Sequence, residues 1–487
     1  MSIKFVPHEY QETGIKFLIE MSFTGLLLDP GLGKTSITLA AFKILQQLGF
    51  VKAALVIAPL KPCYSVWPEE VLKWNEFKHL SVGILHGDKK ADVLREKHDI
   101  YTINPEGLKW LRGQLTGKKV LPFDMLVIDE STRFKHTNNN RAKLLYPMLP
   151  FFKRRVILTG SPAPNGLLDL FGQVYCMDLG ATFGPYISHY RSKYFYVSQS
   201  QTCYKANNLG GIDNFEVPTR FVPKEGAADE IYSRLAPRVL RMAAEDYLQL
   251  PPLVNKTLWV DLPKQARQLY DQLESALVLE FKKGRVTAAN AGVALNKCRQ
   301  LANGGVYLDR EEGESETKRE WKLIHDAKTE ALCDLVEELS GQEALVAYDF
   351  NHDLARAQPA LSKLLGEAVP HIGKGVKATQ AAQIVKRWNA GELPVLLGQP
   401  KSMSHGLNMQ QRGRAVIWYG LTYDYEDYFQ FIRRIWRQGQ TGRVFVYHIL
   451  ARDTVDEAVL ASLQAKRRTE TALLDALKAY WVERGLL

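Results

Sequence analysis

Short apolar runs recur in the first part of the chain, and each is followed by a polar loop and a stretch with helical periodicity. The runs are rich in branched side chains and lie at 25–28, 54–58, 125–128 and 155–158. Strands buried in a parallel sheet have this pattern, because helices cover both faces of such a sheet. The runs therefore predict an α/β unit, although periodicity alone also allows short buried helices.

A second series of apolar runs follows further along the chain, at 344–348, 394–397, 415–418 and 444–448. These runs have the same length and composition as the first series, and turn residues separate them in the same way. They predict a second α/β unit with its own parallel sheet. The chain as a whole is thus expected to be an α/β protein with two similar lobes.

The segment between the two series, residues 226–327, differs in character. It contains a long helical pattern over 264–283 and a charged stretch over 309–322 that is typical of an exposed loop. We interpret it as helical protrusions and a hinge. The expected organisation is a first lobe over 1–225, this helical linker region, and a second lobe with C-terminal helices over 328–487.

Charge adds a first indication of the partner. The chain of 487 residues has 63 Lys and Arg against 53 Asp and Glu, which gives a net charge of +10. A basic surface favours polyanions such as nucleic acid, because neutralised phosphates release their condensed counterions. An unspecialised basic globular protein fits the same charge equally well, so the motifs must decide.

Cysteine usage and hydropathy limit the class of protein further. The five cysteines lie far apart and form no CxxC pair, which argues against the common zinc sites. No segment approaches the roughly 18–20 apolar residues of a membrane span, and the N-terminus lacks the pattern of a signal peptide. We therefore expect reduced, buried thiols, no membrane partner and a cytoplasmic location.

A glycine-rich segment, GLGKT at 31–35, joins the first apolar run to a helical pattern. Backbone amides around Gly31 and Gly33 would surround phosphate oxygens, where larger side chains would obstruct the approach. Lys34 would reach the β- and γ-phosphates of ATP, and the hydroxyl of Thr35 would bind Mg²⁺. The strand before the loop and the helix after it make this motif more specific than its five letters alone.

Two adjacent carboxylates, Asp129 and Glu130, end the apolar run at 125–128. Charges at such a place are costly unless a cation compensates them. Asp129 is suited to hold Mg²⁺, and Glu130 is suited to polarise the water that attacks the γ-phosphate. Such a pair often only caps a helix, but after a phosphate loop it indicates nucleotide hydrolysis.

Further motifs in the first lobe resemble those of superfamily 2 helicases, and in particular of the SNF2 branch. PHEYQ at 7–11 is similar to the glutamine motif, which implies that Gln11 recognises adenine. VIAPL at 56–60, together with Trp67, looks like the next segment of the family. LTGSPAPN at 158–165 resembles the LTGTPxxN coupling motif.

The second lobe carries matching motifs. SHGLNM at 404–409 resembles the GxGLNL element, and QFIRRIWRQGQ at 430–440 resembles the QxxxRxxRxGQ element. The resemblance implies that Gln430 belongs to the nucleotide site, and that Arg434 and Arg437 stabilise charge on the transferred phosphoryl group. The spacing of the two arginines predicts that they share one face of a helix.

The likeness extends over about residues 5–460 and implies two RecA-like lobes that close on ATP and Mg²⁺ and open after hydrolysis. It implies an ATP-dependent DNA translocase or helicase acting on duplex, forked or branched DNA. The small size and QLANGG at 300–305 look like the compact SNF2-type helicases of bacteriophages and prophages. That likeness implies a role in phage DNA replication or recombination, with a separate nuclease or replication protein as partner.

The resemblance also implies contacts from both lobes to the DNA backbone, which carry little sequence information. They are assigned to Lys61, Thr102, Ser161, Asn165, Ser402 and Ser404. Arg133 and Lys135 follow the acidic pair and would either touch nucleic acid or link motifs. A purely structural role for these two residues is an equal alternative.

The sequence departs from the family pattern in three places. Leu28 and Asp29 replace the acidic pair that often precedes the SNF2 glycines, and Leu28 also breaks the strict GxxxxGK[ST] pattern. His405 stands where a small residue is usual. LTYDY at 421–425 replaces Trp-Asn-Pro, and its aromatic residues favour packing in the core.

Three alternatives to a DNA translocase stay open. A binding scaffold with a decayed ATP site is disfavoured, because Lys34, Asp129 and Glu130 are all retained. An RNA helicase is the second alternative, since superfamily 2 contains many, although no pattern here reads a 2′-OH. The third is the motor of a nuclease system, whose cleaving subunit would be another chain because this one carries no nuclease motif.

Overall fold

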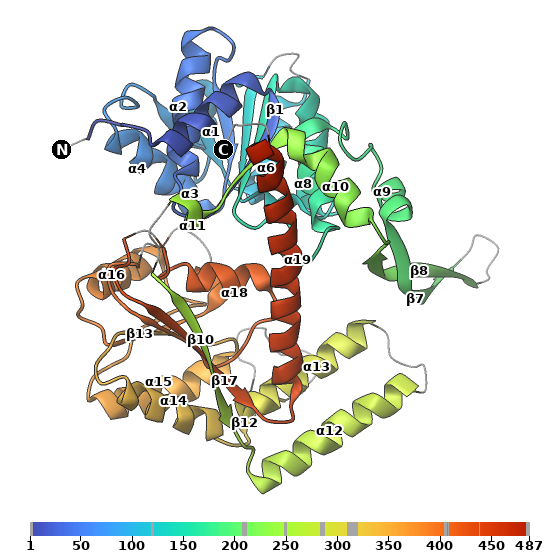
Figure 1. Ribbon diagram of the computed structural model, residues 1–487, viewed down its shortest axis with the longest axis vertical. Helices are drawn as coiled ribbons and strands as arrows, with labels where there is room; N and C mark the ends of the chain where they lie inside the picture. The colour runs from blue at the N-terminus through green and yellow to red at the C-terminus, as the bar shows by residue number, and fades with distance from the viewer. Residues whose placement is uncertain are drawn as a thin grey trace. The chain divides into compact units, whose positions relative to one another are not determined.

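The structure is a computed structural model that describes residues 3–117, 121–206, 212–247, 251–282, 288–308, 320–403, 407, 409–437 and 439–483 (Figure 1). The chain divides into two compact units. Unit 1 consists mainly of Met1–Tyr196 and Phe221–Gln249, and unit 2 mainly of Leu250–Ala465. Each unit has its own sheet and its own hydrophobic core.

Unit 1 is built on a seven-stranded sheet in the order β3-β4-β2-β5-β6-β1-β9. All neighbouring strands are parallel. The strands are β1 Phe23–Leu28, β2 Ala54–Ile57, β3 Val82–Ile84, β4 Ile100–Ile103, β5 Met125–Asp129, β6 Arg154–Thr159 and β9 Val239–Met242. Because the strands are parallel, the loops that follow β1, β5 and β6 meet at one edge of the sheet, where ligands of such folds bind.

Helices connect these strands and cover the faces of the sheet. They are α1 Glu9–Glu20, α2 Lys34–Gln47, α3 Leu60–Tyr64, α4 Val66–Lys73, α5 Lys90–Arg95, α6 Leu108–Leu115, α7 Asn140–Leu145, α8 Asp169–Asp178, α9 Ile187–Tyr194, α10 Ala227–Leu235 and α11 Ala244–Tyr247. A short 3-10 helix, η2 Ser131–Phe134, follows β5 directly. The strands β7 Phe195–Ala206 and β8 Ile212–Pro223 pair in a separate two-stranded ribbon (Figure 1).

Unit 2 is built on a six-stranded parallel sheet in the order β10-β17-β16-β13-β15-β14. The strands are β10 Leu253–Val260, β13 Ala344–Ala347, β14 His371–Ile372, β15 Val395–Gly398, β16 Ala415–Trp418 and β17 Val444–Ala451. The helices are α12 Lys264–Lys282, α13 Ala288–Asn303, α14 Ala327–Glu338, α15 Asn351–Leu365, α16 Ala378–Asn389, α17 Pro400–Met403 and α18 Tyr425–Ile432. The helix α19 Val455–Glu483 begins in unit 2, and its residues from Lys466 onward belong to unit 1. The short strands β11 Gly305–Tyr307 and β12 Trp321–Leu323 pair antiparallel.

The expected fold class, α/β with two parallel sheets, is confirmed. All eight apolar runs are strands, and their residues are almost completely buried, because helices pack on both faces of each sheet. The helical pattern over 264–283 is the helix α12, which lies beside α13 (Figure 1). Among the described residues, no helix is both long and apolar enough to cross a membrane.

The segment 226–327 contains more than the expected helices, since it gives one strand to each sheet. β9 lies at the edge of the first sheet beside β1, and β10 lies at the edge of the second beside β17. Neither strand has the signature of a buried run: β9 contains Arg241, and β10 has half-buried and exposed positions up to its last residue, the buried Val260. The boundaries at 225/226 and 327/328 stay a prediction.

Candidate functional site

The loop between β1 and α2 has a backbone that requires glycine. Gly31 and Gly33 adopt φ angles of 98° and 79°, in the left-handed region that side chains disfavour. A Cβ atom at Gly33 would also lie only 2.6 Å from Nε2 of Gln11. At the two glycines, no side chain covers the backbone of the loop at the carboxyl end of β1, which is what a phosphate-binding loop requires.

Gln11 lies against this loop, as the glutamine motif predicts. It is buried in the first turn of α1, where its Oε1 accepts a hydrogen bond from the backbone N–H of His8 at 3.0 Å. Its Nε2 donates to the carbonyl of Leu32 at 3.4 Å. The amide thus links the start of α1 to the glycine loop, although 21 residues separate Gln11 from Leu32.

Lys34 begins α2 and lies among three carboxylates. Its Nζ donates to the carbonyl of Leu28 at 2.7 Å. Burial lowers the pKa of Lys34, and the nearby charges of Glu130, Asp129 and Asp29 oppose this effect. The structure therefore brings together the lysine and the acidic pair that the motifs assign to nucleotide chemistry.

Asp129 ends β5, and Trp67 holds it in place. Burial and the neighbouring Glu130 raise the pKa of Asp129 to about 6. The indole Nε1 of Trp67, on α4, donates to Oδ2 of Asp129 at 3.1 Å. The sequence shows Trp67 only as part of a family-like segment. A buried tryptophan needs an acceptor for its one polar atom, which is the only signal that points to this role.

Glu130 has an unusual backbone and an unsatisfied carboxylate. Its φ of 54° lies in the left-handed region, which is rare outside glycine and turns the chain sharply from β5 into η2. Its Oε2 is buried and accepts no hydrogen bond from the residues that the structure describes. Buried oxygens are almost always satisfied, so this atom marks a place that a ligand or water completes.

Asp29, which departs from the family pattern, anchors the glycine loop to β9. Its Oδ1 pairs with Nη1 of Arg241 at 2.8 Å, and its Oδ2 accepts from the backbone N–H of Ala244 at 3.0 Å. The same Nη1 donates to the carbonyl of Leu27 at 3.0 Å. Both side chains are buried, so the loop rests on an ion pair that no sequence motif indicated.

The segment 158–165 follows β6 and turns toward α8. The Oγ of Ser161 is buried and has no hydrogen-bond partner among the described residues. Asn165 is exposed, and both its backbone N–H and its Nδ2 donate to Oδ2 of Asp169. Lys135 pairs with the same carboxylate at 3.5 Å. This ion pair links the loop after β5 to α8, and a contact of Lys135 with nucleic acid stays a prediction.

The remaining candidates for DNA contact differ in their access to solvent. Lys61 is half-buried at the start of α3, and Ser402 is exposed on α17. Thr102 is completely buried in β4, and its hydroxyl donates to the carbonyl of Cys63 at 3.2 Å. A phosphate contact from this hydroxyl would require the Cys63 segment to move. Ser404 lies outside the described residues, and the assignment of all six residues to DNA stays a prediction.

The prediction that Arg434 and Arg437 share a helical face is wrong. The helix α18 ends at Ile432, and both arginines follow in turns. Here the chain forms hydrogen bonds between residues three apart. The N–H of Arg434 donates to the carbonyl of Phe431, and the N–H of Ile435 donates to the carbonyl of Ile432. The side chain of Ile435, which follows Arg434, is completely buried.

Arg434 and Gln430 hold each other inside unit 2. The Nε of Arg434 donates to the carbonyl of Gln430 and its Nη2 to the Oε1 of Gln430, both at 3.1 Å. Its Nη1 donates to the carbonyl of Leu407 at 2.9 Å. Arg437 is half-buried, and burial together with the neighbouring Arg433 lowers its pKa. The catalytic roles of these residues stay predictions.

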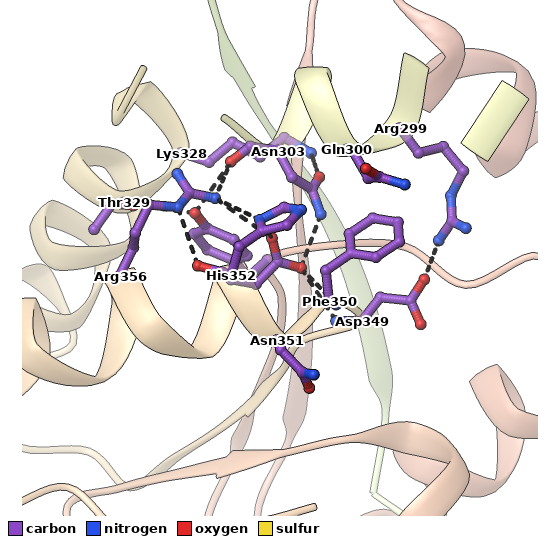
Figure 2. Close-up of polar contacts among 12 residues, drawn as sticks. Arg299, Gln300, Asn303, Lys328, Thr329, Asp349, Phe350, Asn351, His352 and Arg356 are labelled. Carbon is purple, nitrogen blue, oxygen red and sulfur yellow. Dashed lines mark hydrogen bonds and ion pairs between the residues drawn. The ribbon is translucent and has the colours of Figure 1, made fainter. Parts of the chain in front are cut away.

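Unit 2 also contains a buried polar network around the QLANGG segment (Figure 2). Nδ2 of Asn303 donates to Asp353 at 3.0 Å, and Oδ1 of Asn303 accepts from Lys328 at 2.8 Å. Asp353 also pairs with His352 at 3.1 Å and with Arg356 at 3.4 Å. These partners hold the pKa of Asp353 below its usual value, although burial would raise it.

Family comparisons agree with the arrangement of the motifs. The SNF2-related domain matches residues 10–304, and the helicase conserved C-terminal domain matches residues 327–439. The chain belongs to the SNF2-related family. Protein p41 of Acyrthosiphon pisum secondary endosymbiont phage 1 is 34% identical to this SNF2-related chain over 97% of its residues and 99% of the phage protein. The expected likeness to compact phage members is thereby confirmed.

Larger SNF2-related proteins match almost the whole chain as well. The DNA repair and recombination protein RAD54B of Gallus gallus is 22% identical, and the human DNA annealing helicase and endonuclease ZRANB3 is 24% identical. The chain spans only 54% and 41% of these two proteins. Among solved structures, the Sulfolobus solfataricus SWI2/SNF2 ATPase core in complex with dsDNA is 21% identical, with a TM-score of 0.44. The match covers 99% of this chain and 95% of the Sulfolobus chain.

As a member of this family the chain is a DNA-dependent ATP hydrolase, and the use of Mg²⁺ with ATP stays a prediction. No group of three His, Cys, Asp or Glu side chains in the described part of the chain is arranged to hold a metal. Mg²⁺ does not require such a group, because it commonly binds one or two protein oxygens together with water and the phosphates of the substrate. Thr35 and Asp129 would supply the protein oxygens, and the bound ion would neutralise phosphate charge.

Proposed function

We propose that this SNF2-related ATPase moves along DNA, with duplex, forked or branched forms as its substrates. The observation that carries the proposal is the cluster at the carboxyl edge of the unit 1 sheet. There, Lys34 lies among three carboxylates, and Glu130 presents a buried oxygen that no described residue satisfies. A site that is charged and incomplete in this way is suited to a phosphate ligand and its cation rather than to structural support.

Each residue of this cluster has a distinct task in the proposal. Amides of the glycine loop and Lys34 bind the phosphates, while Gln11 recognises adenine beside the loop. Thr35 and Asp129 hold Mg²⁺. Glu130 orients the attacking water, because its unsatisfied oxygen is free to accept a hydrogen bond from it.

The arginines of unit 2 complete the proposed reaction. Arg434 and Arg437 would stabilise the charge that develops on the transferred phosphoryl group, as arginine fingers do. Gln430 accepts a hydrogen bond from Arg434 and would fix the direction of its guanidinium group. Hydrolysis would then depend on both units, which is how ATP turnover becomes coupled to movement.

The choice of DNA substrate rests on charge and on the relatives. The net charge of +10 favours the dense phosphates of a duplex. The names of RAD54B and ZRANB3, with recombination and annealing in them, favour forked or branched forms. The phage protein p41 favours a role in phage DNA replication or recombination in the bacterial cytoplasm, with a separate nuclease or replication protein as partner.

Steady-state phosphate release tests the proposal. The wild-type protein is assayed without nucleic acid and with saturating duplex, forked, four-way and single-stranded DNA and with duplex RNA, each at two salt concentrations. Duplex-containing DNA should stimulate turnover most, and half-saturation should shift to higher DNA concentration as salt rises. Full stimulation by single strands alone would instead indicate an unwinding helicase, and stimulation by RNA alone would overturn DNA as the substrate.

A further inference from the structure

One buried side chain, Gln173 on α8, joins the two loops that flank the catalytic carboxylates. Its Oε1 accepts a hydrogen bond from Oγ of Ser131 at 2.7 Å. Its Nε2 donates to the carbonyl of Pro162 at 2.7 Å and to that of Asp169, one turn earlier on α8, at 2.8 Å. Both amide hydrogens therefore form hydrogen bonds, and one of these bonds joins α8 to the segment 158–165.

The backbone of α8 lies directly against the same loop. A Cβ atom at Gly172 would lie only 2.6 Å from the carbonyl oxygen of Lys135, and closer still to that of Phe134. Asp169, on the same face of the helix, pairs with Lys135 and accepts from Asn165. Neither loop is therefore free to shift relative to α8 without breaking buried contacts.

Each of the two loops carries a buried polar atom without a partner among the described residues. In the loop after β5 the atom is Oε2 of Glu130, and in the loop after β6 it is Oγ of Ser161. Gln173 contacts the residue that follows Glu130 and the residue that follows Ser161. Its amide therefore links the two residues that adjoin Glu130 and Ser161.

We propose that Gln173 is a positioning residue that couples these loops, so that a displacement of 158–165 by DNA changes the position of Glu130. The coupling rests on the proposed DNA-stimulated hydrolysis and adds the means by which DNA regulates it. A neutral amide suits this task, because it bonds a hydroxyl on one side and a carbonyl on the other without placing a charge between them. Gln173 touches neither substrate nor the reacting atoms.

The test compares variants by the ratio of DNA-stimulated to DNA-free turnover, because this ratio does not depend on the fraction of folded protein. Gln173→Met keeps the length of the side chain and removes its hydrogen bonds, and the ratio should fall about tenfold, within the usual range of coupling between sites. Ser131→Ala removes one of these bonds, and the ratio should fall about threefold. Nucleotide affinity should change little in either variant.

Tyr190→Phe is the matched control. The Tyr190 hydroxyl is also buried and donates to a nearby carbonyl, that of Leu167 at 2.8 Å, but it joins neither loop to the other. This variant should lower the melting temperature and keep the wild-type ratio. A larger loss of DNA-free than of DNA-stimulated turnover in Gln173→Met would also contradict the coupling.

The outcomes separate the coupling from the proposed function. A wild-type ratio in Gln173→Met overturns the coupling, as does an equal fall of the ratio in Tyr190→Phe. If Gln173→Met does not fold, Ser131→Ala decides, and an unchanged ratio there overturns the coupling. Absence of DNA stimulation in the wild-type protein would overturn the proposed function itself, and the coupling with it.

Discussion

The two units bury polar clusters of opposite kinds. In unit 2, the carboxylate of Asp353 has three side-chain partners, and Lys328 pairs with Asp456 at 2.6 Å. Among the described residues, the one buried atom of His352 without a hydrogen-bond partner is its Nε2. In unit 1, the cluster around Lys34 contains an excess of carboxylates and the unsatisfied oxygen of Glu130. A buried network whose carboxylates are paired serves as a scaffold, whereas one with an unsatisfied carboxylate oxygen is a place for a ligand.

The difference also explains where each cluster lies. The unit 1 cluster is at the carboxyl edge of a parallel sheet, on loops after β1 and β5. The unit 2 network joins the end of α13 to α14 and α15, so it fastens the helical segment to the second sheet (Figure 2). Substitutions in the first cluster should therefore change turnover, and those in the second should change stability.

The largest expected effect is on turnover, from Lys34→Ala. Loss of the phosphate-binding cation should lower turnover about a thousandfold, which corresponds to about 4 kcal/mol in the transition state. The free energy of unfolding should change little, because Lys34 bonds only one loop carbonyl. Phosphate release and denaturant unfolding measure the two effects. Lys43→Ala, further along α2, is the control, and equal turnover in both variants would contradict the assignment.

The next effect is on stability, from Asp353→Ala. This change removes the carboxylate that His352 and Arg356 share, although Arg356 keeps its contact with Asp326 at 3.5 Å. It should lower the free energy of unfolding by about 3–5 kcal/mol. Urea unfolding followed by circular dichroism measures the loss. Asp271→Ala breaks an exposed pair with Arg267 instead and should cost at most about 1 kcal/mol. Similar losses in the two variants would mean that the buried network is not a scaffold.

A buried histidine in unit 2, His325, should make the free energy of unfolding depend on pH. Burial lowers the pKa of His325 to about 4, so from pH 6.5 down to about 4 the unfolded chain binds a proton that the folded protein rejects. Stability should fall over this window, by about 3 kcal/mol from this residue. Unfolding measured at several pH values should show a smaller fall in His325→Gln. The exposed His189→Gln should follow the wild-type curve, and a wild-type curve for His325→Gln would contradict the inference.

Local sequence was enough for the parts of the fold and site that depend on neighbours in the chain. The glycine loop, Lys34 and Asp129 belong to short motifs, and the long buried strands are unbroken apolar runs. What the sequence missed depends on distant partners. The strand β9 is hard to predict because it contains Arg241, whose buried guanidinium pairs with Asp29, 212 residues away.

The same limit applies to the residues that support the site. Trp67 belongs to a family-like segment that assigns it no contact, and Gln173 lies on a helix with no motif. Their roles follow only from the contacts of Trp67 with Asp129 and of Gln173 with the two loops. The error at Arg434 and Arg437 has a related cause. A spacing of three fits a helix and a succession of turns equally well, and the hydrogen bonds that follow the end of α18 are not visible in the sequence.

The central claim is that nucleotide binding belongs to unit 1, while hydrolysis also requires the arginines of unit 2. Arg437→Ala tests it most directly, with turnover at saturating duplex DNA and nucleotide affinity measured on the same preparation. Turnover should fall about a hundredfold, about 2.7 kcal/mol, while the Kd for nucleotide stays within about threefold of wild type. An equal loss of affinity, or turnover like that of the wild-type protein, would contradict the claim.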